Sequence, residues 1–559
     1  MTVKNTALRV LPLLAACAWP GAGHAQDTKA HGDKPDSGRH HVRSGKVQVT
    51  PYIEVGQVFS AQLSPVDDVV TYSSVAAGVD ASITGRNSAA SASVRYERRF
   101  GWDGNARDGD AVSGVARASI AIAPHAVTLE AGALAQRTSV QGNGSATLGG
   151  LIGNDSSSSQ IYAGYVGPSV HTMAGDVEVE GHYRFGYTRV EEPNALVTAP
   201  GGRPADIFDE STAHVGYVRA GVRPNVVAPI GVGVGAGWNE QNVSNLDQRI
   251  RDRNVRGDVT VPVSPTVAVV GGVGYEDVEV SSRDAQRDAN GTPVIGRDGR
   301  YVTDQTAPRR IAYQTEGLIW DAGVMWRPSR RTSFEGYIGR RYGSFTGWGS
   351  LAYAPDSRTS LNVAVYDNLT SFGGLVTDTL AALPASFEAF RNPITGEIGG
   401  CVANTGAQLG GRDCIAGALS SVRSAVFRSR GVAASYSHEI GRMQLGLGAG
   451  YDRRKFIAAS GTVLASVNGL VDETIWVAAY ANTRLDRQST VSANAYANWF
   501  NGGFALDGDT MGYSASLAYN RTFLDHLSGT AAVGLDGITR DDLPDFTTAS
   551  ALLGLRYSF

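Results

Sequence analysis

A two-residue alternation of apolar and polar side chains runs through most of this chain and limits the folds open to it. From Val75 to Ile83 every second residue is aliphatic, whereas the residues between them include Asp80 and Ser82. A period of two places one kind of side chain on each face of a β-strand. Such segments, roughly ten to seventeen residues long, follow one another from Val47 to the C-terminus. We therefore predict an all-β fold.

Composition helps to decide what kind of sheet this is. The 559 residues are 42% hydrophobic and only 18% charged, yet the mean hydropathy is −0.14. No uninterrupted apolar run is long enough to form a membrane-spanning helix, so any membrane crossing has to be made by strands. A soluble sandwich or a β-helix fits less well, because the alternation persists and no short solenoid period is visible. We predict a single antiparallel up-and-down transmembrane β-barrel over 47–559.

The connections between the segments alternate between short and long, as expected for a barrel with a periplasmic and an extracellular end. The short ones lie at 123–125, 175–176, 224–229, 264–266, 328–329, 355–356, 439–442, 486–487 and 525–526. The long ones lie at 139–157, 191–212, 239–250, 283–312, 370–424 and 457–472. This phase predicts about 22 strands, within 20–24 if one hairpin is merged or split, with long extracellular loops and both termini in the periplasm.

The N-terminus has the features of a secretory signal peptide. Two basic residues precede the apolar stretch 10–19, and a small-x-small site precedes a predicted cleavage between Ala25 and Gln26. Residues 1–25 would then be removed on export. A lipobox that ends at Cys17 is the alternative, and it would leave that cysteine lipidated. Both interpretations send the chain to the cell envelope.

The stretch 26–46 is polar and shows no apolar periodicity, so we predict a disordered periplasmic tail. Its histidines His31, His40 and His41 could bind a metal, but a solvated tail is the favoured interpretation. The formal net charge of the chain is −4, and this charge indicates no basic surface for nucleic acid.

The longest connection, 370–424, contains Cys401 and Cys414. Two cysteines close together in an exported chain predict a disulfide, with two free thiols as the alternative. Aliphatic residues at helical spacing precede them and end at Pro384. A connection of this length is usually functional or disordered. It either narrows the lumen or covers the outer surface.

The polar face of each strand predicts the lining of the lumen, because a charge facing lipid costs a few kcal/mol. By this parity the inward-facing candidates are Arg95, Glu97, Arg99, Arg117, Glu130, Glu178, Glu180, His182, Arg184, Arg219, Asp321, Glu335, Arg341, Asp452 and Arg556. Two interpretations stay open. The charges either pair along the wall and solvate the interior, or face one another across a constriction.

Signals for catalysis are weak. Of the ten histidines only His182 and His214 fall within the predicted wall and away from its turns. Neither has a Ser, Cys or Asp at the spacing of a nucleophile elbow or a metal site. We predict no enzyme activity, no cofactor and no metal site.

The last strand indicates the protein class. Leu555, Tyr557 and Phe559 alternate with polar residues, and the chain ends on the aromatic ring. This ending resembles the C-terminal assembly signature of bacterial outer-membrane β-barrels, which implies insertion by the barrel-assembly machinery and an outer-membrane location. An open sheet edge cannot remain in lipid, so Val49–Leu63 should pair with Phe546–Phe559 as antiparallel neighbours.

At the level of pattern, 47–559 resembles outer-membrane β-barrel porins of the kind named beta-barrel porin 2. The resemblance implies a passive channel for small polar or saccharide-like solutes, in contact with outer-membrane lipid and lipopolysaccharide. Energy-coupled transporters with a similar number of strands carry an N-terminal plug domain, for which 26–46 is too short. The alternative is a non-conducting barrel that acts in surface-polysaccharide or secretion assembly, or as a structural surface protein.

Overall fold

The computed structural model describes residues 46–102, 108–141, 143–148, 158–191, 210–297, 299–404, 413–503, 508–541 and 543–559. The predicted signal peptide 1–25, its cleavage site at Ala25 and Gln26, and the tail up to residue 45 lie outside the described residues. The division into signal peptide and tail therefore stays a prediction.

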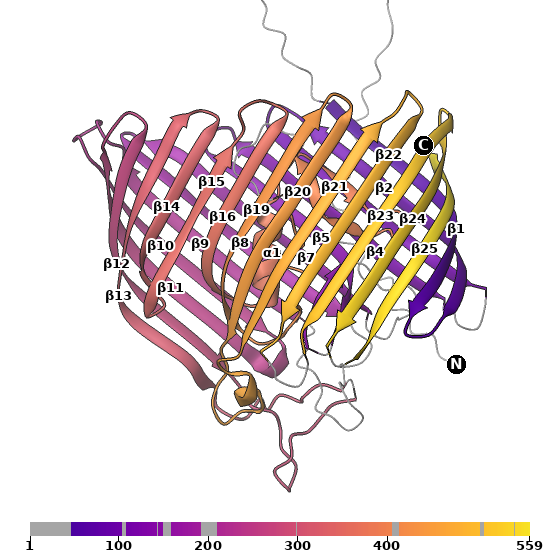
Figure 1. The fold of residues 1–559 in the computed structure, drawn as a ribbon. Helices are drawn as coiled ribbons and strands as arrows, with labels where there is room; N and C mark the ends of the chain where they lie inside the picture. The colour runs from indigo at the N-terminus through magenta and orange to yellow at the C-terminus, as the bar shows by residue number, and fades with distance from the viewer. Residues whose placement is uncertain are drawn as a thin grey trace, which may run out of the picture. The chain divides into compact units, whose positions relative to one another are not determined.

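The described strands form an all-β, antiparallel, ring-like sheet (Figure 1). This sheet has 23 strands, but the short β6 (Ala146–Leu148) pairs only with β5, and β5 also pairs directly with β7. The other 22 strands make the wall, consistent with the predicted number. They are β1 (Lys46–Ser64), β2 (Asp68–Thr84), β3 (Ser88–Gly101), β4 (Gly109–Ala123), β5 (Val127–Val140), β7 (Ser158–Ala174), β8 (Val177–Glu191), β9 (Glu210–Val222), β10 (Gly231–Val243), β11 (Gln248–Pro262), β12 (Val267–Ser282), β13 (Arg310–Ser329), β14 (Thr332–Arg341), β15 (Ser344–Tyr353), β16 (Thr359–Thr370), β19 (Phe427–Ile440), β20 (Met443–Phe456), β21 (Val471–Arg484), β22 (Ser489–Asn501), β23 (Thr510–Leu524), β24 (Leu527–Arg540) and β25 (Leu543–Ser558).

The first and last strands close the ring. Strands β1 and β25 are antiparallel, with Tyr52 opposite Ser558 and Val58 opposite Leu552. The predicted closing contact is confirmed. No edge of the wall is left open there, as a sheet in a low-dielectric environment requires.

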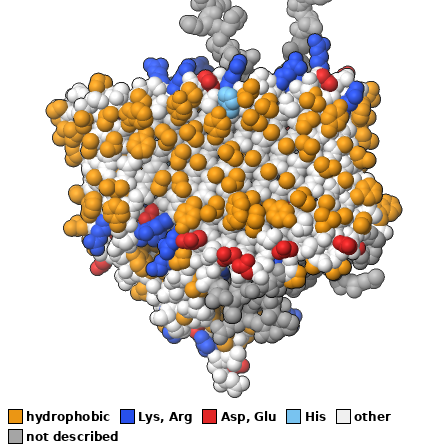
Figure 2. Space-filling model, viewed as in Figure 1, with side chains coloured by type: hydrophobic (Ala, Val, Ile, Leu, Met, Phe, Trp, Pro, Cys, Tyr) orange, Lys and Arg blue, Asp and Glu red, His pale blue; other side chains and the backbone are white. Residues whose placement is uncertain are grey.

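Alternation along the strands gives the wall two different faces. Outward side chains such as Val55 and Leu555 are 47% and 48% exposed and form part of an apolar band, which Figure 2 shows in orange on the face in view. Charged side chains of the neighbouring strand β3, such as Arg95 and Glu97, are buried within the barrel. The band predicted from the two-residue period therefore exists on the outer surface.

The connections divide the barrel into a short-turn end and a long-loop end. The predicted short turns all lie between strands or at strand ends, for example at Gly175 between β7 and β8, whereas 328–329 forms the end of β13. One prediction is wrong: the connection expected to be long at 239–250 is short, because β10 and β11 extend to within a few residues of each other. Leu246 and Asp247 take positive φ there, which makes the tight reversal within η4 (Asn245–Asp247).

One long segment folds inside the ring. Between β16 and β19 the chain forms α1 (Phe372–Ala382) and the hairpin β17 (Phe387–Arg391) with β18 (Ile398–Asn404). Figure 1 shows α1 enclosed by the wall strands. We call residues 371–426 the internal segment; 405–412 of it are not described. The helix predicted from the aliphatic spacing is confirmed, and it ends just before Pro384.

A second short helix, η5 (Val463–Val467), lies in the connection between β20 and β21. Within the described ranges, no helix has the length and apolar character needed to cross a membrane.

Candidate functional site

The internal segment closes the long-loop half of the barrel with a hydrophobic core. Wall residues in this core come largely from the long-loop ends of their strands, among them Val140, Ile161 and Val190. The internal segment contributes a larger apolar set to the same core: Phe372, Val376, Leu380, Leu383, Phe387, Phe390, Ile398, Val402, Ile415, Leu419 and Val422. Of the two placements left open by the sequence, the structure shows the one inside the lumen.

Helix α1 is attached to the wall by close contact. The hydroxyl of Ser371 accepts a hydrogen bond from the Gly374 N–H and so caps the helix. The side-chain oxygen of the buried Gln241 accepts hydrogen bonds from the Ser371 N–H at 2.8 Å and its hydroxyl at 2.7 Å. A Cβ at Gly374 would lie 2.3 Å from that oxygen, and one at Gly373 would lie 1.8 Å from the Ser211 hydroxyl. Only glycine fits at these two positions.

The hairpin is cross-linked and lies against the opposite wall. A disulfide joins Cys401 of β18 to Cys414, as predicted. Its sulfur atoms lie against Gly448 of β20, where a Cβ would come within 2.3 Å of the Cys414 Sγ. The disulfide therefore joins β18 to the part of the internal segment that contains Cys414, at a point where both contact strand β20.

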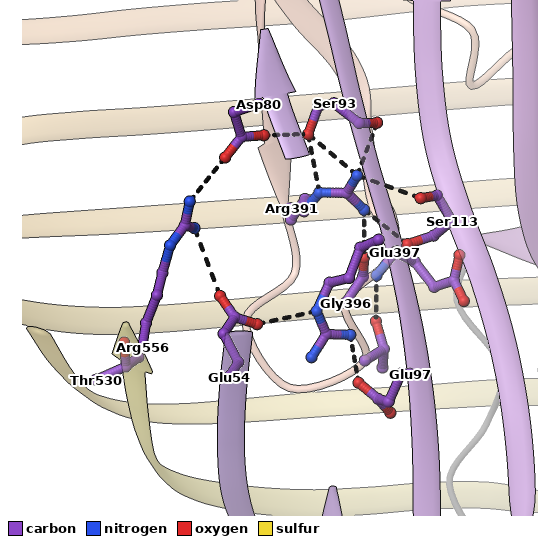
Figure 3. Close-up of polar contacts among 12 residues, drawn as sticks. Glu54, Asp80, Ser93, Glu97, Ser113, Arg391, Gly396, Glu397, Thr530 and Arg556 are labelled. Atoms are coloured by element: carbon purple, nitrogen blue, oxygen red, sulfur yellow. Dashed lines mark hydrogen bonds and ion pairs between the residues drawn. The ribbon is translucent and has the colours of Figure 1, made fainter. Parts of the chain in front are cut away.

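Arg391 connects the hairpin to strands β3 and β4 (Figure 3). Its guanidinium donates to the Ser93 carbonyl at 2.9 Å, the Ser113 hydroxyl at 2.6 Å and the Gly396 carbonyl at 2.7 Å. The acceptors are neutral oxygens from two wall strands and from the hairpin's own turn. A planar five-donor group suits such a divergent set, which a lysine could not reproduce.

Glu397 makes a second polar contact between the hairpin and the wall. Its carboxylate is 1% exposed and accepts a hydrogen bond from the Arg137 N–H at 3.2 Å. The neighbouring Ile398 N–H donates to the Gln136 side chain at 3.2 Å. Burial raises the pKa of the Glu397 carboxyl, although the charge of Arg137 opposes that shift.

Asp413 is a second buried acid in the internal segment. One of its carboxylate oxygens accepts hydrogen bonds from the Ser435 hydroxyl at 3.1 Å and the Asn362 amide at 3.5 Å. Burial raises the pKa of Asp413 to about 6, and these hydrogen bonds only partly oppose the rise. The hairpin end of the internal segment thus contains a carboxyl that titrates near neutral pH.

Two large cavities flank the internal segment, and the α1-side one extends from the short-turn end to Leu369 and Thr370 at the long-loop end of β16. The α1-side cavity has a volume of about 1440 Å³ and is bounded by Leu375 and Asp378 of α1. The hairpin-side cavity has a volume of about 1100 Å³ and is bounded by Phe387 and Arg391. The α1-side cavity reaches Arg223 and the hairpin-side cavity reaches Arg487, residues in or next to short turns between strands.

Charges of alternating sign run along the wall of the α1-side cavity. Arg219 lies 3.8 Å from Glu180 and 2.7 Å from Asp258. Arg256 continues the row, at 3.1 Å from Asp258 and 2.6 Å from Asp321. Neighbouring strands thus neutralise one another's charges along the wall.

Further predicted residues lie beside this row. His182, Arg184, Glu335 and Arg341 also line the α1-side cavity. Arg341 forms an ion pair with Asp252 at 2.8 Å. The arrangement is one of local pairs along the wall.

A second network faces the hairpin-side cavity. Glu54 links Arg95 at 3.0 Å to Arg556 at 3.4 Å, and Arg556 also reaches Asp80 at 2.8 Å (Figure 3). The buried Glu97 pairs with both Arg95 and Arg99. Arg99 in turn donates to the carbonyl of Thr395 in the hairpin turn. The predicted residues Arg95, Glu97, Arg99 and Arg556 therefore belong to one group.

The other predicted residues belong to separate ion pairs, and Glu130, Glu178 and Arg184 also line the α1-side cavity. The pairs are Arg117 with Glu130 at 2.9 Å, Glu178 with Arg223 at 2.5 Å, Arg184 with Asp378 at 3.4 Å, and Asp452 with Arg454 at 2.7 Å. Among the residues that the structure describes, no cluster of three or more His, Cys, Asp or Glu could hold a metal ion.

Sequence reasoning missed two kinds of site residue. Glu54, Arg256 and Asp258 lie in strands, and the parity rule applied to every strand would have found them. Arg391 and Glu397 lie in a connection without periodicity, where the only signal was a charge within an otherwise apolar stretch.

Comparison with known proteins gives no match to a family model or to a curated protein sequence. Solved structures that are similar include the FrpB iron transporter from Neisseria meningitidis (10% identity, TM-score 0.41, covering 91% of this chain and 81% of that one). The ferric-catecholate import receptor Fiu from E. coli K12 has 9% identity and a TM-score of 0.43, covering 90% of this chain and 81% of that one. The alcaligin outer-membrane receptor FauA from Bordetella pertussis has 11% identity and a TM-score of 0.37, covering 91% of this chain and 76% of that one.

The prediction of a passive porin-like channel is wrong. These similar structures are receptors and transporters for iron and iron carriers by their titles, not porins, and they give the non-conducting alternative no support either. The physical reason for the error is the internal segment, whose hydrophobic core occupies the long-loop half of the lumen. At these TM-scores and identities the likeness assigns neither a ligand nor a mechanism to this chain.

Proposed function

We propose that this chain is a gated outer-membrane importer, in which a barrel in lipid is kept shut by its own internal segment until that segment moves. The single observation that carries the proposal is the hydrophobic core between the internal segment and the wall. A water-filled lumen would gain no stability from such a core, whereas a closed lumen would be stabilised by it.

The membrane location rests on the outer surface of the wall. Leu318 is 80% exposed and Val273 is 68% exposed, and similar residues continue around the ring. Exposed apolar side chains in a continuous band favour lipid as the surrounding medium. Outer-membrane receptors among the similar structures and the C-terminal Phe559 are consistent with an outer-membrane location, reached through the predicted signal peptide.

The covalent connections of the internal segment suit a movable part. Thr370 and Phe427, which flank it, are direct partners on β16 and β19. The internal segment can therefore leave the lumen while the wall keeps its pairing. A ligand bound at the long-loop end would have to displace the apolar core, and its path would continue through the two charged cavities to the short-turn end.

Single-channel recording in planar bilayers tests the proposal. Because Thr370 and Phe427 are adjacent, residues 371–426 can be replaced by a two-residue Asn-Gly turn. We expect the wild type to stay closed, with rare openings, and the deletion variant to conduct continuously. Arg391→Ala, which removes the link to β3 and β4, should raise the frequency of openings.

A matched control shortens another long connection, the one between β12 and β13. Ala285 and Thr303 are bridge partners, so 286–302 can be shortened to a two-residue turn without touching either cavity. This control should stay closed. Wild-type conductance equal to that of the deletion variant would overturn the proposal. An unchanged opening frequency in Arg391→Ala would show a fixed seal instead of a gate.

A further inference from the structure

Basic side chains gather on the outer face of the wall near its long-loop end. Arg428 and Arg430 of β19 lie directly opposite Lys455 and Arg453 of β20. Arg340 of β14 lies nearby. Phe345 is the cross-strand partner of Arg340, and its carbonyl accepts a hydrogen bond from Arg430 at 3.0 Å. We call Arg340, Arg428, Arg430, Arg453 and Lys455 the basic patch. Like charges directly opposite one another destabilise a sheet, so this arrangement needs a counterion.

The wall supplies too few carboxylates for these five cations. Asp367 pairs with Arg428 at 2.6 Å and with Arg430 at 3.0 Å. Glu473 pairs with Arg453 at 3.2 Å. In the described part of the chain, neither Arg340 nor Lys455 has an ion-pair partner, and both are exposed. The basic patch therefore carries a surplus of positive charge.

Elsewhere on the rim, basic residues lie opposite or beside acidic ones. Arg251 and Arg253 of β11 lie directly opposite Glu279 and Asp277 of β12. Arg98 lies within 3.8 Å of Asp108 and 3.7 Å of Asp110. The surplus at the basic patch is thus a local feature and not a general property of the rim.

The basic patch begins where the apolar band ends. Val432 is 37% exposed, and two residues away on the same face Arg430 is 42% exposed by its side chain. On the next strand Tyr451 is followed in the same way by Arg453. Figure 2 shows Lys and Arg side chains gathered below the orange band, toward the long loops. In a bilayer this is the level at which acyl chains give way to headgroups.

Two of the four guanidinium groups are held in place. Asp367, whose side chain is 3% exposed, binds both Arg428 and Arg430. Ser344 accepts further hydrogen bonds from both arginines. Arg430 stays 42% exposed by its side chain, and a guanidinium group fixed at the surface suits the oxygens of a phosphate.

We propose that the basic patch binds the phosphate groups of an anionic glycolipid of the lipid A class in the outer leaflet, with its acyl chains on the apolar band beside Val432. The fit rests on charge complementarity and on the level of the basic patch at the edge of the band. This inference depends on the membrane location proposed above but not on gating.

The test measures binding of purified diphosphoryl lipid A to the refolded full-length chain in detergent, by native mass spectrometry and thermophoresis. The variant combines Arg430→Gln, Arg453→Gln and Lys455→Gln. Each cation near a membrane surface contributes roughly a fivefold change in affinity, so we expect the triple variant to bind on the order of 100-fold more weakly. Removing like charges relieves repulsion, so this variant should still fold.

The control combines Arg98→Gln, Arg251→Gln and Arg253→Gln, which lie on the same rim but face carboxylates on neighbouring strands or loops. It should bind lipid A like the wild type. Lipid A without phosphates should bind poorly, and inorganic phosphate at the same concentration should not compete. Equal binding by the triple variant or by dephosphorylated lipid A, or full competition by inorganic phosphate, would overturn the inference. Single-channel recordings of the same variants report separately on the gate.

Discussion

The two halves of the internal segment are attached to the barrel in different ways. Helix α1 is held by close steric contact of Gly373 and Gly374 with the wall and by hydrogen bonds between neutral groups at Gln241. The hairpin is attached by charged groups, through Arg391, Glu397 and Asp413. Steric contacts respond little to pH, whereas buried titratable groups such as Glu397 and Asp413 respond to it. The difference identifies α1 as the fixed part and the hairpin as the part that responds to conditions.

The largest effect is expected at the helix. Gly374→Val would force a branched side chain against Gln241 and disturb the N-cap at Ser371, with a cost of about 3 to 4 kcal/mol. We expect near-continuous conductance in bilayers. Gly271→Ala is the matched control, because no atom lies within 4 Å of its Cβ position. Normal closure in Gly374→Val would show that shape does not hold α1.

Local pattern was enough to predict the wall, because strand faces and turns depend on neighbouring residues. The alternation from Val75 to Ile83 predicted the outer and inner faces of the wall. The alternation of short and long connections predicted which end of the barrel each turn occupies. The internal segment depends on contacts distant in sequence: Arg391 and Ser93 are 298 positions apart. No local period records such a contact. The loop's placement was therefore left open, and the channel prediction built on an open lumen failed.

The second effect is expected at the hairpin. Arg391→Ala leaves the oxygens of Ser93, Ser113 and Gly396 without their donor, at a cost of about 3 kcal/mol. Amides of β18 should lose protection against hydrogen exchange while those of α1 keep it. Arg391→Lys should recover only part of the protection. Equal loss of protection in α1 and β18 would show that the two halves move as one unit.

The third effect is a dependence on pH. Burial raises the pKa of Asp413 to about 6, whereas the ordinary aspartate pKa of 3.8 applies when the hairpin is undocked. The docked state therefore binds more protons between pH 6 and 4, and docking becomes more stable as pH falls through this window, by about 2 kcal/mol. Exchange protection of β18, corrected for intrinsic rates, should rise on acidification. Asp413→Asn should weaken the pH dependence and leave the part contributed by the Glu397 carboxyl, whose pKa burial also raises; an unchanged dependence would exclude Asp413 as a source.

The smallest effect is expected for the charge pair at α1. Asp378 lies 3.4 Å from Arg184, but its side chain is 41% exposed, so the pair is screened by water. Asp378→Asn should change the protection of α1 by less than about 1 kcal/mol. A larger loss would mean that charge, and not shape alone, holds the helix.

The most direct test of the closed lumen is dye release from proteoliposomes. Vesicles that contain the wild type and a small entrapped fluorescent dye should retain the dye, because the core around the internal segment seals the long-loop half. Vesicles with the variant that lacks 371–426 should release it at once. Release from wild-type vesicles at the rate of the deletion variant would contradict the gated barrel.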